Sequence, residues 1–196
     1  IPLPKGEFYH FGTTRQLLST TLRLQNLVAD QRRIMHLDAK PNPALFVQNC
    51  LVRNPLTERN NNVWIENSVI GKNWTLTSEN VVTGVPDNDW TLTLEPGQCL
   101  DMVPVGEKGY AVRPYGYDDA MKGDPEKETT MFLGQPYLEW AKKHGIDNAE
   151  FATDIQLLPL FPVVGDIDDA GKVAAWMISD GTDDEGRNCL LYTSDA

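Results

Sequence analysis

A glycine turn close to the start of the sequence contains residue types that could bind a phosphate group. Gly12 permits a tight turn, and Thr13 or Thr14 can cap the following helix by accepting a hydrogen bond from a backbone N–H. Arg15 lies in the first helical turn, where N–H groups and the helix dipole also favour anions. His10, Thr13 and Arg15 are therefore candidate substrate-binding residues, although a His10 bonded to the backbone and an Arg15 on the surface would fit the same pattern.

A second group of candidates lies in an aromatic and polar loop in the second half of the sequence. Carboxylates accept hydrogen bonds from sugar hydroxyls, and tyrosine faces can stack on a sugar ring. The substrate-binding candidates of this kind are Tyr115, Asp118, Asp119 and Lys122, with Tyr117 as a second stacking face. A solvated loop whose aromatics pack in the core would explain the same residues equally well.

The sequence lacks a loop that could cradle the phosphates of a nucleotide. Neither the Walker pattern nor another glycine-rich phosphate loop occurs in it, and segment 181–186 is too acidic to hold a phosphate. Cys50, Cys99 and Cys189 lie far apart and predict neither a zinc site nor a disulfide framework. We therefore expect no catalytic residue and no metal ligand within this chain.

The elements around the first candidates are an aromatic segment, a turn and a helix. The run Glu7–Phe11 is typical of a strand, since aromatic residues favour strands. Apolar residues then recur at helical spacing from Leu17 to Ile34, and Pro41 ends the pattern. The sequence thus predicts a strand, a tight turn and an amphipathic helix of about five turns.

The stretch 44–105 has the residue pattern of an all-β segment, with short β-branched and aromatic runs separated by Gly, Asn, Asp and Pro. Ile70, Leu76 and Val82 stand six residues apart. This spacing is typical of a parallel β-helix, in which each spaced aliphatic side chain points inward. An antiparallel sandwich would account for the same residues nearly as well.

The last third of the sequence mixes strands and helices. A strand precedes the candidate loop, and Pro136–Gly145 has the early proline, late cations and closing glycine of a short helix. The proline-broken segment Ile155–Val164 is expected to be a packed connection. Further expectations are a final helix capped by Asp168 or Asp169, and surface positions at helix ends for His36 and His144.

The turn Phe8–Thr14 has an aromatic-x-x-x-Gly-Thr pattern that resembles the closing motif of sugar-1-phosphate nucleotidylyltransferase catalytic domains. In that superfamily a Rossmann-like domain ends at such a turn, and a β-helix often follows. His10 stands where many members carry an aspartate that in some helps to hold the metal ion. A metal-binding role is therefore not carried over to this histidine.

The order of the other motifs is similar to that of the fucose-1-phosphate guanylyltransferase family, and most of all to its bifunctional bacterial members, which add a C-terminal kinase. These motifs are Leu24–Val28, Tyr115–Asp119 with Lys122–Gly123, and Phe132–Pro136 ahead of Trp140. Together with the glycine turn, they make the resemblance extend over nearly all of residues 7–164.

The resemblance implies a β-rich α+β chain in three parts. Residues 1–43 would be the C-terminal edge of a Rossmann-like nucleotidylyltransferase core, residues 44–108 a partial parallel β-helix, and residues 109–188 a mixed α/β sugar-binding or linker region. It also implies a fragment of an enzyme of GDP-L-fucose salvage synthesis. L-fucose 1-phosphate, GTP and ATP would be its ligands and Mg²⁺ its cofactor. Because the nucleotide loops would lie outside this chain, the fragment alone should be inactive.

Two other classes of function are left open. A β-helical oligomerisation or acyltransferase-like module would share the hexads, but an acyltransferase needs a histidine beside the coil, and none occurs between His36 and His144. A carbohydrate-binding β-domain would need an exposed row of aromatics. For Trp64, Trp74 and Trp90 we instead expect positions in the core.

Composition limits the partners and the compartment. Seventeen Lys and Arg against 28 Asp and Glu give a net charge of −11, which argues against nucleic acid and anionic membranes. We find neither a signal sequence nor a run of about 18 apolar residues, and the scattered cysteines favour a reducing, cytoplasmic compartment. A homo-oligomer is left open.

The last eight residues, 189–196, resemble the translation of a sequencing-library adapter, and we expect them to be non-native. The sequence also begins without Met. From these two features we expect the native gene to be longer than the 196 residues given.

Overall fold

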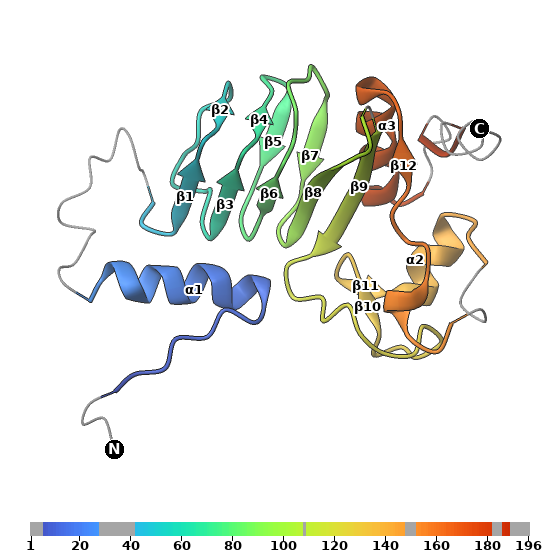
Figure 1. Cartoon of the computed structure of the whole chain (residues 1–196), viewed down its shortest axis with the longest axis horizontal. Coiled ribbons are helices and arrows are strands. Elements are labelled where there is room, and N and C mark those ends of the chain that lie inside the picture. Colours follow the sequence, from blue (N-terminus) through green and yellow to red (C-terminus); the bar gives the residue numbers. More distant parts are fainter. Residues whose placement is uncertain (1–5, 28–41, 108, 148–151, 182–185, 189–196) are drawn as a thin grey trace.

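The computed structural model describes residues 6–27, 42–107, 109–147, 152–181 and 186–188, arranged as in Figure 1. Helix α1 lies across the lower ends of a run of short strands, and a region with two helices follows the last of them. The elements are α1 Thr14–Gln25, β1 Leu45–Gln48, β2 Leu51–Val52, β3 Val63–Glu66, β4 Val69–Ile70, β5 Trp74–Leu76, β6 Val81–Thr83, β7 Leu92–Leu94, β8 Gln98–Val105, β9 Gly109–Gly116, β10 Met131–Phe132, β11 Gln135–Pro136, α2 Tyr137–Lys143, the 3-10 turn η3 Ile155–Leu157, β12 Val163–Val164 and α3 Ile167–Ile178.

Strands β1 to β8 stack as the coils of a parallel solenoid. In the largest sheet β1, β3, β6 and β8 are parallel neighbours, and two smaller parallel pairs join β2 to β4 and β5 to β7. Leu45 pairs with Val63, and Trp74 with Leu92, so that equivalent positions are eighteen residues apart. One coil therefore takes three six-residue units, which confirms the β-helix and excludes an antiparallel sandwich for this stretch.

The spaced aliphatic side chains point into the coil, as the six-residue spacing predicts. Ile70 and Val82 are fully buried, and Leu76 is half-buried against the same core. Trp74 and Trp90 stack beside them with ring centroids 6.0 Å apart. Removal of this apolar surface from water, worth about 25 cal/mol per Å², is the main favourable term that holds the coil together.

Buried amide side chains close the corners between successive coils. Asn80, which is 0% exposed, accepts at Oδ1 from the N–H of Thr77 at 2.7 Å. Its Nδ2 donates to the carbonyl oxygens of Glu95 and Gln98 at 2.9 and 2.8 Å, one coil further on. Asn60 makes the same pattern one coil earlier. These amides satisfy corner groups that the strand ladders leave without partners.

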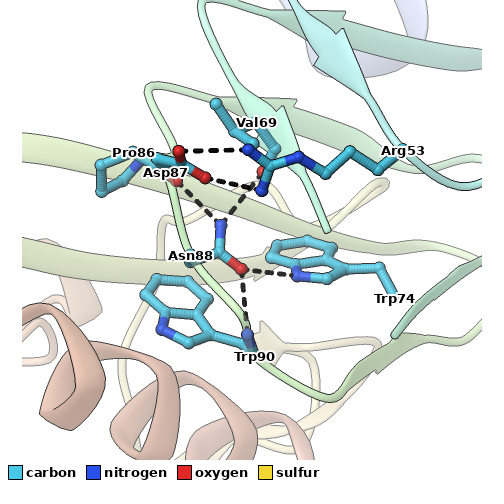
Figure 2. Close-up of polar contacts among 7 residues, drawn as sticks. All are labelled: Arg53, Val69, Trp74, Pro86, Asp87, Asn88 and Trp90. Carbon is cyan, nitrogen blue, oxygen red and sulfur yellow. Dashed lines mark hydrogen bonds and ion pairs between the residues drawn. The ribbon is translucent and has the colours of Figure 1, made fainter. Parts of the chain in front are cut away.

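The Asn88 side chain supplies hydrogen-bond partners at another corner, as Figure 2 shows. Its Nδ2 donates to the carbonyl oxygens of Val69 and Pro86 at 3.1 and 2.8 Å. Its Oδ1 accepts from the indole N–H of Trp74 at 2.9 Å and from the backbone N–H of Trp90 at 3.2 Å. One side chain thus joins two successive turns of the coil and fixes the orientation of the Trp74 indole.

The sheet changes from parallel to antiparallel at the hairpin of β8 and β9. Strand β9 pairs with β8 along its whole length, from Gln98 opposite Gly116 to Val105 opposite Gly109, and pairs with β12 on its other edge. Helix α3 packs beside β9 and β7 (Figure 1). The C-terminal end of the solenoid is therefore covered by protein instead of ending in an open strand edge.

Helices α2 and α3 meet through an aromatic cluster. The ring of Trp140 on α2 lies 4.6 Å from Phe132 and 4.5 Å from His144, and Trp176 on α3 meets His144 edge-on at 5.0 Å. The predicted short helix is confirmed, but the surface position expected for His144 is wrong, because its side chain is 2% exposed. Its ring nitrogens lie 2.8 and 2.9 Å from the carbonyl oxygens of Trp140 and Trp176, since α3 covers this end of α2.

The aromatic run Glu7–Phe11 does not form the predicted strand. Residues 6–11 have no regular secondary structure, and their neighbour is helix α1. The Thr20 hydroxyl donates to the His10 carbonyl oxygen at 2.8 Å, and the Arg23 guanidinium lies 5.2 Å from the centre of the Tyr9 ring. A strand needs another strand for its backbone groups, and the described residues bring none beside this segment.

The helix boundaries differ from the sequence prediction in two places. Helix α1 ends at Gln25, and most of its predicted continuation lies outside the described residues, as do His36 and the tail 189–196. Helix α3 is capped by Asp166, whose carboxylate accepts from the N–H groups of Asp168 and Asp169, so these two lie inside the first turn. Among the helices that the structure describes, none is long and apolar enough to span a membrane.

We expect Asn80→Ala to lower the free energy of unfolding by about 2–3 kcal/mol, because it removes a fully buried amide and three part-buried hydrogen bonds to the backbone. Urea unfolding followed by tryptophan fluorescence measures this change. The matched control is Asn61→Ala at an exposed position, which should change stability by less than about 0.5 kcal/mol. Equal effects of the two substitutions would contradict the role of the corner amides.

Candidate functional site

Candidates from the two sequence stretches meet in one ion pair. Arg15, in the first turn of α1, donates from Nε to Asp118 Oδ1 at 2.7 Å and from Nη2 to Oδ2. The same guanidinium lies 5.6 Å from the centre of the Tyr117 ring. Two parallel hydrogen bonds fix the direction of a guanidinium more strictly than one does. The pair therefore connects the start of α1 to the loop that follows β9.

The ion pair changes the ionisation of its members. Hydrogen bonds from Arg15 hold the pKa of Asp118 below its usual value, and Asp118 raises the pKa of Arg15. Burial raises the pKa of Tyr117 to about 12, so its phenol stays neutral. Because the two charged side chains are 58% and 59% exposed, water screens their attraction and the pair adds little to stability.

Asp119 anchors the loop through backbone hydrogen bonds. Its Oδ2 accepts from the N–H groups of Gly116 and Leu133 at 2.7 and 2.6 Å, and its Oδ1 accepts from that of Gly134 at 3.2 Å. A Cβ on Gly116 would lie 2.5 Å from Oδ1, so this approach requires glycine. The carboxylate thus joins the end of β9 to the β10–β11 turn.

The remaining sequence-predicted residues lie apart from the Arg15–Asp118 contact. Thr13 caps α1, where its Oγ accepts from the N–H of Gln16 at 3.2 Å. His10 exposes its side chain, and its backbone carbonyl accepts from Thr20. Lys122 is exposed on the loop. Capping and backbone bonding explain Thr13 and His10 structurally, and a substrate contact by Thr13, His10 or Lys122 stays a prediction.

A pocket of about 410 Å³ opens between β9, the start of α1 and segment 155–161. Tyr115 and Asp119 line it, and burial raises the pKa of the Tyr115 phenol, which therefore stays protonated. Sequence reasoning missed most of the other lining residues. These include Thr14, Asp101, Arg113, Met121, Gln156 and Phe161.

Two of the missed residues form a charged pair across the hairpin. Asp101 on β8 lies opposite Arg113 on β9, and Arg113 Nη1 is 3.1 Å from Asp101 Oδ2. The Thr83 hydroxyl donates to Asp101 Oδ1 at 2.6 Å. Each of the two is a charged residue inside an otherwise mainly apolar strand. That interruption is a sequence signal that could have identified them.

The described residues do not fit a magnesium site. The carboxylate of Asp118 is paired with Arg15, that of Asp119 accepts backbone N–H groups, and that of Asp101 is held by Arg113 and Thr83. In the ranges that the structure covers, no cluster of three or more His, Cys, Asp or Glu side chains could hold a metal ion. We therefore derive no step through a metal from these residues.

The order of elements is a turn, a helix, a parallel β-coil and an aromatic α/β region, and comparison with known families decides what it represents. The model of the fucose pyrophosphorylase domain matches residues 1–166. The chain belongs to the fucose pyrophosphorylase family. A curated relative, the L-fucokinase/L-fucose-1-P guanylyltransferase of Bacteroides fragilis, is 48% identical over 194 residues.

The matched relative is much longer than this chain. The alignment covers 97% of the chain and 20% of the relative, so this fucose pyrophosphorylase family chain spans about one fifth of that protein. No solved structure matches the chain. The family resemblance inferred from the glycine turn and the loop motifs is confirmed.

The two alternative classes of function are not favoured. Trp74 and Trp90 are buried, and Trp64 is half-buried with its ring 5.4 Å from that of Phe46, so these tryptophans form no exposed row. Of the histidines that the structure describes, His144 lies enclosed between α2 and α3 and His10 lies before α1, so neither supports an acyltransferase-like role.

The Asp118 carboxylate should titrate below its ordinary pKa of 3.8 and should shift back toward that value in Arg15→Gln. Because its folded-state pKa is depressed, its contribution to stability is present above pH 3.8 and is lost as the pH falls below it. Carbon-detected NMR of the side-chain carboxyl measures both titrations.

The matched control for this titration is Arg53→Gln. Arg53 pairs with Asp87 at 2.7 Å on the coil (Figure 2), and it follows β2, which lies well away from the loop after β9 (Figure 1). That variant should leave the titration of Asp118 unchanged. An Asp118 titration that is the same in the wild type and in Arg15→Gln would show that the ion pair does not form in solution.

Proposed function

We propose that this chain is a central part of a longer enzyme of GDP-L-fucose salvage synthesis. That enzyme phosphorylates L-fucose with ATP and then joins L-fucose 1-phosphate to the guanylyl group of GTP. The observation that carries the proposal is the family match over residues 1–166, supported by the 48% identity to a protein named for both activities.

Within that enzyme we assign the chain the role of scaffold and sugar-side wall. The solenoid is a rigid support because its corner amides and strand ladders satisfy the backbone. The Arg15–Asp118 pair holds the start of α1 against the loop after β9, and the pocket lies beside this connection. The proposed sugar contacts are the loop residues Tyr115, Asp118, Asp119 and Lys122, with His10, Thr13 and Arg15 from the glycine turn.

The chemistry of the proposed reaction requires groups that this sequence does not supply. Transfer at phosphorus depends mainly on positioning and on neutralising the charge that develops on the phosphate oxygens. We propose that nucleotide loops elsewhere in the longer enzyme, with Mg²⁺ bound to the nucleotide, meet this requirement. The chain supplies the surface against which the sugar is positioned.

We further propose a cytoplasmic location, which suits an enzyme that uses GTP and ATP. Cys50 and Cys99 are free thiols in the structure, as expected in a reducing compartment. Neither nucleic acid nor a membrane is a proposed partner, because the net charge is −11. The homo-oligomer that the sequence left open stays a prediction, which sedimentation of the purified full-length protein would test.

The full-length protein that contains this chain should form GDP-fucose from L-fucose 1-phosphate and GTP, and should phosphorylate L-fucose with ATP. The 196-residue chain alone should form no GDP-fucose, because it has no phosphate-cradling loop. Chromatographic detection of the nucleotide sugar measures both activities. A full-length protein that is folded but makes no GDP-fucose would rule out the proposed function.

A further inference from the structure

The C-terminal end of α3 is held by side chains from the preceding fold. The last carbonyl groups of a helix have no partner within that helix. Here the carbonyl oxygens of residues 176–178 meet three side-chain nitrogens, those of His144 at 2.9 Å, Trp140 at 2.9 Å and Gln98 at 3.4 Å. Trp140 lies in α2 and His144 is its C-terminal cap, so these contacts fix α3 relative to α2.

A row of buried rings continues from this contact toward the candidate loop. The His144 ring is stacked on Trp140 with ring centroids 4.5 Å apart, and Trp140 meets Phe132 edge-on at 4.6 Å. None of the three side chains is more than 2% exposed. Because protein interiors are close-packed, a shift of one ring in this row displaces the next.

Phe132 stands next to the turn that binds Asp119. The N–H groups of Leu133 and Gly134, the two residues that follow it, donate to the Asp119 carboxylate at 2.6 and 3.2 Å. Leu133 has a φ of 52°, a left-handed conformation that residues other than glycine seldom adopt, so this turn depends on the contacts around it. The position of Phe132 therefore influences that of both N–H groups.

The connection from this turn to α2 has little slack. Strand β11 runs directly into α2, which begins at Tyr137. The Lys143 ammonium at the other end of the helix donates to Gln135 Oε1 at 2.7 Å, and the Tyr137 N–H donates to the Thr130 carbonyl oxygen at 2.9 Å. The helix and the turn thus form one body, which α3 covers.

We propose that His144 and Trp140 are positioning residues through which the docking of α3 orders the loop after β9. Where it concerns substrate, the inference rests on the proposed function, which assigns sugar contacts to this loop. With α3 in place, the row of rings holds the β10–β11 turn against Asp119. When α3 moves away, the turn loosens and the loop loses its order. Neither positioning residue lines the pocket beside β9.

His144→Phe should break this connection and keep the fold. Phenylalanine retains a ring against Trp140 and removes both ring nitrogens. The two carbonyl oxygens that meet those nitrogens each keep another partner. That of Trp140 accepts from the backbone N–H of residue 144 at 3.1 Å, and that of Trp176 accepts from the Ser179 hydroxyl at 2.8 Å. The substitution therefore leaves neither carbonyl without a hydrogen bond.

The first test measures the kinetics of the full-length protein with His144→Phe and with Trp140→Phe, which removes the indole N–H that binds α3. Each should raise the KM for L-fucose 1-phosphate roughly three- to tenfold and leave the KM for GTP unchanged. The matched controls are Trp64→Phe, which loses an indole bond to Glu66 on the coil, and Asn60→Ala, which loses a corner amide. Unchanged KM values in both cluster variants, or equal rises in the controls, would overturn the inference.

The second test follows the turn itself by hydrogen exchange and mass spectrometry of the full-length protein. The peptide that contains Leu133 and Gly134 should exchange several-fold faster in His144→Phe than in the wild type, because its N–H groups are held less firmly on Asp119. Trp64→Phe should leave this rate unchanged. If the folded His144→Phe protein exchanges at the wild-type rate, the inference is wrong.

A double substitution identifies the route. If His144 acts through Asp119, adding His144→Phe to Asp119→Asn should raise the KM for L-fucose 1-phosphate no further. A rise equal to the product of the two single effects would show that the two residues act independently, and would contradict the proposed connection.

The outcomes separate this inference from the proposed function. A folded wild-type protein without activity on L-fucose 1-phosphate and GTP contradicts the proposed function, whereas the exchange measurement still decides whether α3 orders the turn. An active wild-type enzyme whose cluster variants behave like Trp64→Phe leaves the proposed function intact and overturns the positioning role of His144 and Trp140.

Discussion

The pairing of β8 with β9 is the constraint on which the rest of the molecule depends. Strand β8 is the last parallel strand of the coil through its contact with β6 and the first antiparallel strand of the hairpin. A slip of one residue would move the side chains of β9 to the opposite face. It would remove Val112 from the core, where it is 0% exposed, and Arg113 from the pocket. Core packing and the position of Arg113 in the pocket beside β9 are therefore fixed by the same set of backbone hydrogen bonds.

The corner amides support the strand register in the part of the coil that precedes β8. Each coil must turn sharply, and the turn leaves backbone N–H and C=O groups that no strand can pair. Asn60, Asn80 and Asn88 are buried and supply those partners between successive turns of chain. The strands can then remain as short as two to four residues in the coil before β8. The stabilising hydrogen bonds are therefore distributed along the solenoid. The β8–β9 hairpin covers its C-terminal end.

Local signals made much of the fold predictable, and non-local contacts explain the rest. The six-residue spacing of Ile70, Leu76 and Val82 predicted the coil because each six-residue repeat lies within one short segment of sequence. The strand predicted for the aromatic run before Gly12 was wrong, since strand formation depends on a neighbouring strand and not on residue type alone. In the site, the loop carboxylates were predictable by type. Their division into an ion-paired Asp118 and a backbone-bonded Asp119 was not, because those partners come from α1 and from the β10–β11 turn.

A structure of the full-length protein with L-fucose 1-phosphate bound would test the central claim most directly, because it locates the sugar relative to the hairpin. We expect the sugar phosphate in contact with the glycine turn before α1 and with the loop after β9, which Arg15 and Asp118 connect. A sugar phosphate bound entirely by other parts of the enzyme, out of contact with the glycine turn and with the loop after β9, would contradict the account.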